Sequence, residues 1–182
     1  MSKDLVYFDL ETRRTANDVG GWGNKHQMGI SIAVTYSTRL SEYRIYEQDD
    51  SQELIEQLKR ADCVIGFNHI SFDYEVLMGQ TVLDFRDQVR SFDLLEDIEK
   101  RLGHRIKLED AAAATLGVGK TADGLKALSW WQQGRLLEIA EYCAHDVRAT
   151  KCLHEYGVEH GQIKYHDRRG TVQTLEVDWR IA

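Results

Sequence analysis

The 182-residue sequence has no proline, only three cysteines and no long apolar run. The cysteines, Cys63, Cys143 and Cys152, are odd in number and lack the spacing of zinc ligands, so neither a disulfide framework nor a zinc site is indicated. No apolar stretch approaches the about 18 residues of a membrane span, and the first residues do not form a signal peptide. We therefore expect reduced thiols in a cytoplasmic protein without a membrane anchor. The missing proline indicates no function.

Positive charge is also scarce, because 23 lysines and arginines face 30 aspartates and glutamates, a net charge of -7. Proteins that coat nucleic acid normally have a basic surface, so this balance argues against that class. It does not exclude a nuclease, whose acids are offset by bound cations. Arg13, Arg14 and Lys25 then remain as candidate contacts to an incoming strand, although a solvated charged loop is the simpler interpretation of each.

The pattern of apolar residues predicts one α/β domain over residues 1–182, with no repeat or internal linker. Strands followed by helices favour a mixed β-sheet flanked by α-helices, with a β-hairpin at the C-terminus. The expected strands cover about 4–10, 28–36, 43–46 and 63–67, and the hairpin tail covers about 162–179. The expected helices cover about 50–61, a short stretch from Asp73, 92–102, 108–116, 125–131 and 135–156. A capping box between Asp50 and Glu53 is expected to open the first helix.

Two acids, Asp9 and Glu11, end the apolar run that begins at Leu5. Side chains two residues apart on a strand point to the same side, so the two carboxylates are expected to lie together. Paired acids repel one another unless they are protonated or bridged by a cation, and a hard divalent ion with oxygen ligands is the usual solution. The pair is therefore a candidate metal site.

Further acids stand in matching contexts. Asp73 follows the apolar run of residues 63–67, and Tyr142 and Asp146 are four apart in a predicted helix. Residues four apart share a helix face, so Tyr142 and Asp146 are expected to face one site. His145 points roughly 100° away from Asp146 and is a poor partner for the same metal. Singly, each residue has a simpler interpretation: a loop acid, a helix cap, a packed tyrosine or a solvated helix face. The ordered set of five favours a phosphoryl-transfer centre.

These segments resemble the three motifs of the DEDDy branch of the ribonuclease H-like 3'-to-5' exonucleases. Residues 8–12, 68–73 and 142–146 are similar to the first, second and third motif. The histidine branch places its general base five positions before the last acid, and this sequence has Glu141 there. Tyr142-Cys143 before Asp146 is also similar to the proofreading domains of family B DNA polymerases. The resemblance covers about residues 4–156, while Gly20-Gly21-Trp22 and the tail look like stand-alone or helicase-associated exonucleases.

The resemblance implies a ribonuclease H-like fold and a two-metal mechanism with Mg²⁺ or Mn²⁺. Asp9, Glu11, Asp73 and Asp146 would be the metal ligands, and Tyr142 would orient the attacking water. An unperturbed phenol has a pKa of about 10, so Tyr142 would remain protonated at neutral pH. The products would be nucleoside 5'-monophosphates, released from a single-stranded or frayed 3' end that a helicase or a replication or repair partner delivers.

Four residues near the motifs are candidate substrate contacts: Thr12, Trp22, Asn68 and Phe72. Trp22 could stack on a terminal base, a contact worth about 1–3 kcal/mol, or fold against the core. Asn68 could bond the substrate backbone or brace its turn, and Phe72 could stack or pack in the core. Trp130 and Trp131 are expected in the core or an interface.

Two smaller expectations concern acids and histidines outside these motifs. Asp93 is explained as an acid at a helix start. His154, His160 and His166 show no zinc spacing and are expected at the surface.

Two other functions are compatible with this pattern. An inactive ribonuclease H-like module that binds nucleic acid or docks a partner would have eroded acids, yet none of the four is missing. An endonuclease of the same fold would use similar carboxylates but would not need the Tyr142 arrangement. Comparing linear and circular single strands separates exonuclease from endonuclease.

Overall fold

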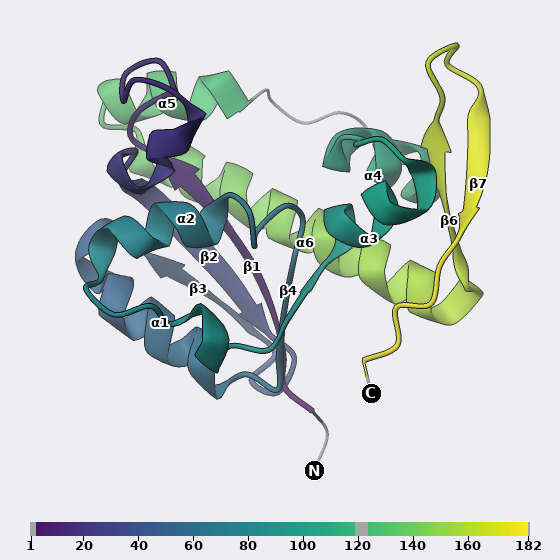
Figure 1. Ribbon diagram of the computed structural model, residues 1–182, viewed down its shortest axis with the longest axis horizontal. Helices are drawn as coiled ribbons and strands as arrows, with labels where there is room; N and C mark the ends of the chain where they lie inside the picture. The colour runs from purple at the N-terminus through teal and green to yellow at the C-terminus, as the bar shows by residue number, and fades with distance from the viewer. Residues whose placement is uncertain (1–2, 119–123, 182) are drawn as a thin grey trace.

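A computed structural model describes residues 3–118 and 124–181 of the chain. The strands form a five-stranded sheet in the order β3-β2-β1-β4-β5 and a separate hairpin of β6 and β7 (Figure 1). Their bounds are β1 Leu5–Thr12, β2 Ile30–Ser37, β3 Glu42–Tyr46, β4 Cys63–Gly66, β5 Ser91–Asp93, β6 Gln162–His166 and β7 Val172–Glu176. β1, β2 and β3 are antiparallel neighbours, whereas β4 and β5 run parallel to β1. The predicted mixed sheet, meander and terminal hairpin are confirmed.

Helices cover both faces of this sheet. The α-helices are α1 Ser51–Arg60, α2 Asp73–Leu77, α3 Leu94–Leu102, α4 Leu108–Leu116, α5 Gly124–Gln132 and α6 Leu136–His160. Short 3-10 turns lie at η1 Trp22–Gln27, η2 Gln48–Asp50, η3 Met78–Gln80 and η4 Arg86–Gln88. In Figure 1, α1 and α2 lie on one face, and the long α6 runs across the other. In the described part of the chain, no helix is both long and apolar enough to cross a membrane.

β1 is the central strand, and its residues alternate between two cores. Val6, Phe8 and Leu10 pack with α1 and α2 in one cluster, while Tyr7 packs beneath α6 in the other. The alternation continues into Asp9 and Glu11, which therefore share the α6 side. The register with β2 shifts between Glu11 and Thr12, and such irregularities bend a strand locally. The carboxyl end of β1 thus places two acids at the edge of a packed core.

The C-terminal tail is anchored by buried groups rather than by sheet pairing alone. Trp179 is fully buried, its ring stacks on His154, and a Cβ at Gly157 would lie 2.4 Å from it. His154 Nε2 donates to the Trp179 carbonyl oxygen at 3.0 Å, and in the neutral ring Nδ1 accepts from the Tyr7 hydroxyl at 2.9 Å. The expectation that His154 lies at the surface is wrong, because the tail folds over that part of α6.

Two local predictions are also corrected. The predicted helix over 92–102 begins at Leu94, since Phe92 and Asp93 belong to β5, and Asp93 is the N-cap of α3. The capping box lies one turn earlier than expected: Glu47 and Asp50 bracket η2, and Asp50 makes no side-chain bond at the start of α1. Asp93 therefore matches its expected role as a helix-start acid.

Candidate metal centre and adjoining pocket

Three acids from two distant parts of the chain meet at the carboxyl end of β1. Asp9 and Glu11 from β1 and Asp146 from α6 each offer one carboxylate oxygen, and these oxygens lie within 4.8 Å of one another. The Asp146 side chain is only 14% exposed. Strand alternation and helix packing produce this arrangement, because α6 lies directly on β1 and β2. Hard divalent cations bind such clusters of carboxylate oxygens.

Asp73 approaches the same strand from α2. It is 3% exposed, and its Oδ1 accepts a hydrogen bond of 2.9 Å from the backbone N–H of Leu10, between the two acids of β1. Its charge is the strongest neighbouring influence that raises the pKa of Asp9. Asp73 is nevertheless outside the three-acid cluster, so the four predicted metal ligands form a group of three and one neighbour.

The electrostatics of the cluster favour the binding of a cation. Burial, and then the neighbouring carboxylates, raise the pKa of Asp9 and Glu11 well above their ordinary range. Burial raises the pKa of Asp146 to about 6 and that of Asp73 to about 7. Among residues 3–118 and 124–181, no lysine or arginine forms a salt bridge with any of these four acids. A divalent cation would supply the charge that the protein withholds.

Tyr142 lies beside the cluster, as its spacing from Asp146 predicts. The side chain is 8% exposed, and its ring meets the edge of Trp130 with centroids 6.3 Å apart. Burial, followed by the charges of Asp146 and Glu11, raises the pKa of this phenol, so it stays protonated. Its hydroxyl is therefore a hydrogen-bond donor and acceptor rather than a strong base.

Two neighbours of the cluster, Cys143 and Glu109, were not predicted from the sequence. The Cys143 thiol donates to the Asp9 carbonyl oxygen at 3.3 Å and to its Oδ2 at 3.4 Å. After burial, the charge of Glu109 on α4 has the largest effect in raising the pKa of Asp146. His145, which the helical spacing predicts to be a poor partner for the same metal, has its Nδ1 3.7 Å from Asp146 Oδ1 and is not part of the three-acid cluster. A cysteine directly after Tyr142 was the one visible signal.

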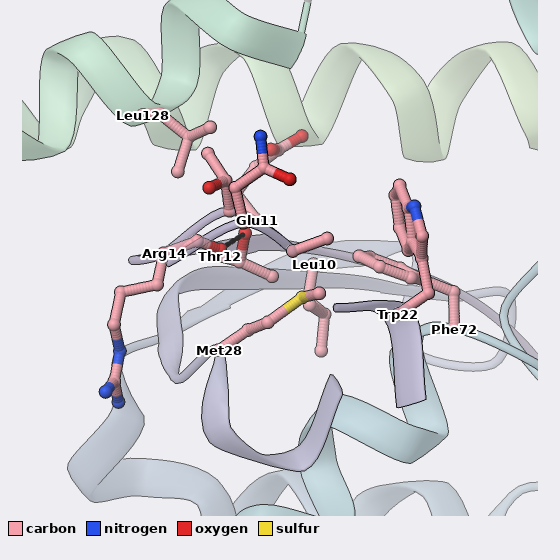
Figure 2. Close-up of a pocket in the computed structure, with 11 residues that line it drawn as sticks. Leu10, Glu11, Thr12, Arg14, Trp22, Met28, Phe72 and Leu128 are labelled. Atoms are coloured by element: carbon pink, nitrogen blue, oxygen red, sulfur yellow. Dashed lines mark hydrogen bonds between the residues drawn. The ribbon is translucent and has the colours of Figure 1, made fainter. Parts of the chain in front are cut away.

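A pocket of about 410 Å³ opens next to the acids. Glu11 belongs to both the cluster and the pocket wall, which links them (Figure 2). The wall also contains three of the four predicted substrate contacts: Thr12, Trp22 and Phe72. Figure 2 shows Trp22 and Phe72 side by side, and their ring centroids are 6.3 Å apart. Trp22 is 67% exposed, so it does not fold into the core.

The wall that holds Trp22 is fixed to the α2 region by close backbone contact. Lys25 of η1 donates from Nζ to the Ser71 carbonyl oxygen at 2.7 Å. A Cβ added at Gly79 would lie 1.8 Å from the His26 carbonyl oxygen, which is far inside normal contact. η1 is therefore held tightly against η3.

The fourth predicted substrate contact, Asn68, lies outside the lining of this pocket. Its backbone has a left-handed φ of 72°, and its Oδ1 accepts from Ser71 Oγ at 2.7 Å and from Arg105. These bonds match the interpretation of Asn68 as a brace of its own turn.

The predicted basic contacts are mostly engaged within the protein. Arg13 donates from Nε to the Ile30 carbonyl oxygen at 2.7 Å, and its guanidinium lies 4.4 Å from the Trp131 ring centroid. Lys25 is tied to Ser71. Arg14 lines the pocket, but Figure 2 shows its side chain extending away from Glu11. None of the three presents a free cation toward the acids.

The sequence matches the RNase H superfamily over residues 6–158, and the chain belongs to that superfamily. Its structure is similar to a family B DNA polymerase from the hyperthermophilic archaeon Pyrobaculum calidifontis, with a TM-score of 0.66 and 15% identity. It is also similar to an ExoI/SSB-Ct complex, with a TM-score of 0.56 and 11% identity. A third similar structure is E. coli Exonuclease I in complex with a dA16 oligonucleotide, with a TM-score of 0.55 and 12% identity.

Each likeness covers 87% of this chain. The chain matches 25% of the polymerase and 42% and 41% of the two exonuclease chains, so it spans less than half of these proteins. A search of curated proteins found no significant match.

Proposed function

We propose that the chain is a metal-dependent 3'-to-5' exonuclease of the DEDDy type. The observation that supports this most is the cluster of Asp9, Glu11 and Asp146, which shares Glu11 with a pocket lined by aromatic rings. A phosphodiester held at the acids would place its terminal nucleoside in that pocket. The three structural likenesses, two of them to exonuclease chains, support the same class.

The acids would hold two divalent cations, Mg²⁺ or Mn²⁺. Asp9, Glu11 and Asp146 would hold one of them, and Asp9 with Asp73 the other. When bound, these ions supply positive charge for the attacking water and for the leaving 3' oxygen. Since magnesium retains waters among its ligands, four carboxylates are enough.

The protein's own side chains would position the reactants. The protonated Tyr142 hydroxyl would accept a hydrogen bond from the attacking water or donate one to it. This bond would direct the water toward the phosphorus. The water's oxygen would form a bond to phosphorus as the bond to the 3' oxygen breaks. The products would be a nucleoside 5'-monophosphate and a strand shortened by one nucleotide.

The terminal base would lie between the apolar wall and Trp22. Base stacking on an aromatic side chain accepts any base, which suits a nuclease without sequence preference. A net charge of -7 disfavours broad duplex binding, so we expect a single-stranded or frayed 3' end as substrate. A helicase or a replication or repair protein would be a suitable supplier of such ends.

End-blocked oligonucleotides test this proposal directly. With Mg²⁺ or Mn²⁺, a 3'-blocked single strand should resist digestion while a 5'-blocked strand is degraded to mononucleotides. The Asp9→Ala variant should be inactive, and Asp49→Ala, which changes an exposed acid of η2, should match the wild type. Equal cutting of a closed circle would instead indicate an endonuclease, and metal binding without hydrolysis would indicate an inactive module.

A further inference from the structure

Behind the candidate metal centre lies a buried acid that belongs to neither the metal cluster nor the pocket. Asp93 ends β5 and is 4% exposed. β5 pairs with β4, so Asp93 lies next to Gly66, just before the loop of residues 68–73. That loop ends at Asp73, one of the four acids. Asp93 therefore lies against the backbone of the loop of residues 68–73, on the side away from the acids.

The Asp93 carboxylate accepts hydrogen bonds from both of its neighbours in space. From the loop, Asn68 N–H donates to Oδ1 at 2.8 Å and Ile70 N–H donates to Oδ2 at 3.0 Å. From α3, Leu95 N–H donates to Oδ1 at 3.0 Å, with Glu96 N–H at 3.4 Å. One side chain therefore joins the loop to the helix start, which a cap alone does not require.

His69 backs this carboxylate from inside the loop. It is fully buried, and its Nδ1 lies 3.4 Å from Asp93 Oδ2. Its ring packs edge-on against Tyr74, with centroids 5.0 Å apart. A Cβ at Gly66 would lie 2.6 Å from the ring, so the glycine leaves the space that His69 fills.

The loop passes this placement on to Asp73. Its first residue, Asn68, has a left-handed backbone, which is uncommon without glycine and needs support from its surroundings. Phe72 N–H donates to the Asn68 carbonyl oxygen and Tyr74 N–H to that of His69, at 3.0 and 2.9 Å. At the far end, Asp73 bonds to Leu10 N–H on β1. Hydrogen bonds and the short stretch of backbone between them therefore connect Asp93 to β1.

We propose that Asp93, backed by His69, is a positioning residue of the metal centre. It holds the loop of residues 68–73 in the conformation that places the Asp73 carboxylate beside Asp9. The proposal rests on the proposed function, because it assigns Asp93 a role in metal binding without contact to the metal. Partners of this kind around metal ligands typically contribute about 10–100-fold in metal affinity.

The test compares Asp93→Asn with Asp97→Asn as a matched control. Asp97 is an acid of α3, the helix that Asp93 caps. It accepts from Trp179 Nε1 at 2.8 Å and pairs with Arg101, so it stabilises the tail and not the loop. Mn²⁺ affinity is measured by calorimetry on the full chain, well below each melting temperature. We expect about 10–100-fold weaker Mn²⁺ binding in Asp93→Asn and unchanged binding in Asp97→Asn, even where both lose stability.

Amide hydrogen exchange without metal provides a second measurement. Exchange at Asn68 and Ile70 should be faster in Asp93→Asn than in Asp97→Asn. If Asp93→Asn does not fold, His69→Phe keeps the packing against Tyr74 and removes the ring nitrogens, and a smaller loss of Mn²⁺ affinity is expected.

Wild-type Mn²⁺ affinity in a folded Asp93→Asn, or in His69→Phe, would overturn the proposal, as would an equal loss in Asp97→Asn. Failure of the wild type itself to bind Mn²⁺ would sink the nuclease function. The exchange rates at Asn68 and Ile70 would then still decide whether Asp93 holds the loop.

Discussion

Two sets of carboxylates, the cluster of Asp9, Glu11 and Asp146 and the single buried Asp93, lie at the same sheet and have opposite surroundings. Asp9, Glu11 and Asp146 face one another with few donors. Burial and neighbouring carboxylates raise the pKa of Asp9 and Glu11, and burial with the charge of Glu109 raises the pKa of Asp146. Asp93 is 4% exposed and more deeply buried than the three acids of the cluster, yet its pKa lies below its ordinary value. Burial would raise that pKa, but His69 and the N–H groups of Ile70 and Asn68 outweigh it.

The difference separates an acid whose oxygens are bonded within the protein from acids that could bind a cation. A carboxylate whose oxygens are filled by backbone N–H groups has little left to offer a metal. A carboxylate without donors costs stability until a cation arrives. Asp73 lies between the two cases, since one oxygen accepts from Leu10 N–H while its pKa is still raised to about 7.

The largest expected effect comes from substituting one acid of each set and comparing hydrolysis and stability. Asp9→Asn should lower hydrolysis by about a thousandfold or more, because several kcal/mol of charge stabilisation in the transition state is lost. The metal-free variant should be as stable as the wild type or more stable, since repulsion is relieved. Thermal melting and a nucleotide-release assay measure both effects.

Asp93→Asn should show the opposite stability change, with a lower melting temperature. If Asp9→Asn destabilised the metal-free protein as strongly as Asp93→Asn does, the contrast between the two sets would be wrong.

The next effect concerns Tyr142, which lies beside the cluster of Asp9, Glu11 and Asp146. Tyr142→Phe should lower kcat by about 10–100-fold, because the substitution removes only the hydroxyl that we propose positions the water. Mn²⁺ affinity should be unchanged, since the ring and its contact with Trp130 remain. A stability loss with normal turnover would show that Tyr142 is only a packing residue.

A third effect is a pH dependence of stability in the metal-free protein. The pKa values of Asp73 and Asp146, about 7 and about 6, exceed the ordinary 3.8, so the folded state binds more protons than the unfolded chain in this range. Their contribution is fully present below about pH 4 and is lost as the pH rises through 6 and 7, by roughly 1 kcal/mol per pH unit for each group.

Denaturant melts of wild type and Asp146→Asn between pH 5 and 8 would measure this slope. The variant should show the smaller decrease, and saturating Mg²⁺ should flatten the wild-type curve. Identical slopes without metal would contradict the assignment of a raised pKa to Asp146.

The smallest effect lies in the pocket. Trp22→Ala should raise KM for single-stranded oligonucleotides by about tenfold, within the 1–3 kcal/mol of one stacked base, and leave kcat nearly unchanged. Leu83→Ala, which removes a comparably exposed apolar side chain outside the pocket, serves as the control. Unchanged KM in Trp22→Ala would remove Trp22 from the substrate contacts.

Local pattern was sufficient for most of the fold. The alternation along β1 and the helical spacing of Tyr142 and Asp146 are written in adjacent residues, so the meander and the meeting of Asp9, Glu11 and Asp146 could be predicted. β5 could not, because three residues are too few to show a period and the following helix pattern extends over them. Because β5 pairs with β4, Asp93 not only caps α3 but also contacts the loop of residues 68–73.

The remaining failures arise from contacts between distant segments. His154 has a polar position on α6, and only the folded tail with Trp179 buries it. Glu109 influences Asp146 because α4 packs on α6, which no spacing within either helix reveals. The sequence suggested Arg13 as a contact to the nucleic-acid strand. In the structure its guanidinium instead contacts the Trp131 ring and the Ile30 carbonyl oxygen.

Gly79 contacts neither the acids nor the pocket, yet the absence of a side chain there sets where Trp22 can be. The His26 carbonyl oxygen occupies the volume that a methyl group would need, so any larger residue at 79 must push η1 away from η3. Gly79 lies outside the pocket, yet it therefore determines how close η1 and Trp22 lie to the rest of the pocket wall, and so the width of the pocket that a nucleotide would enter. Changes in substrate size preference can arise at position 79 while every acid of the centre stays in place.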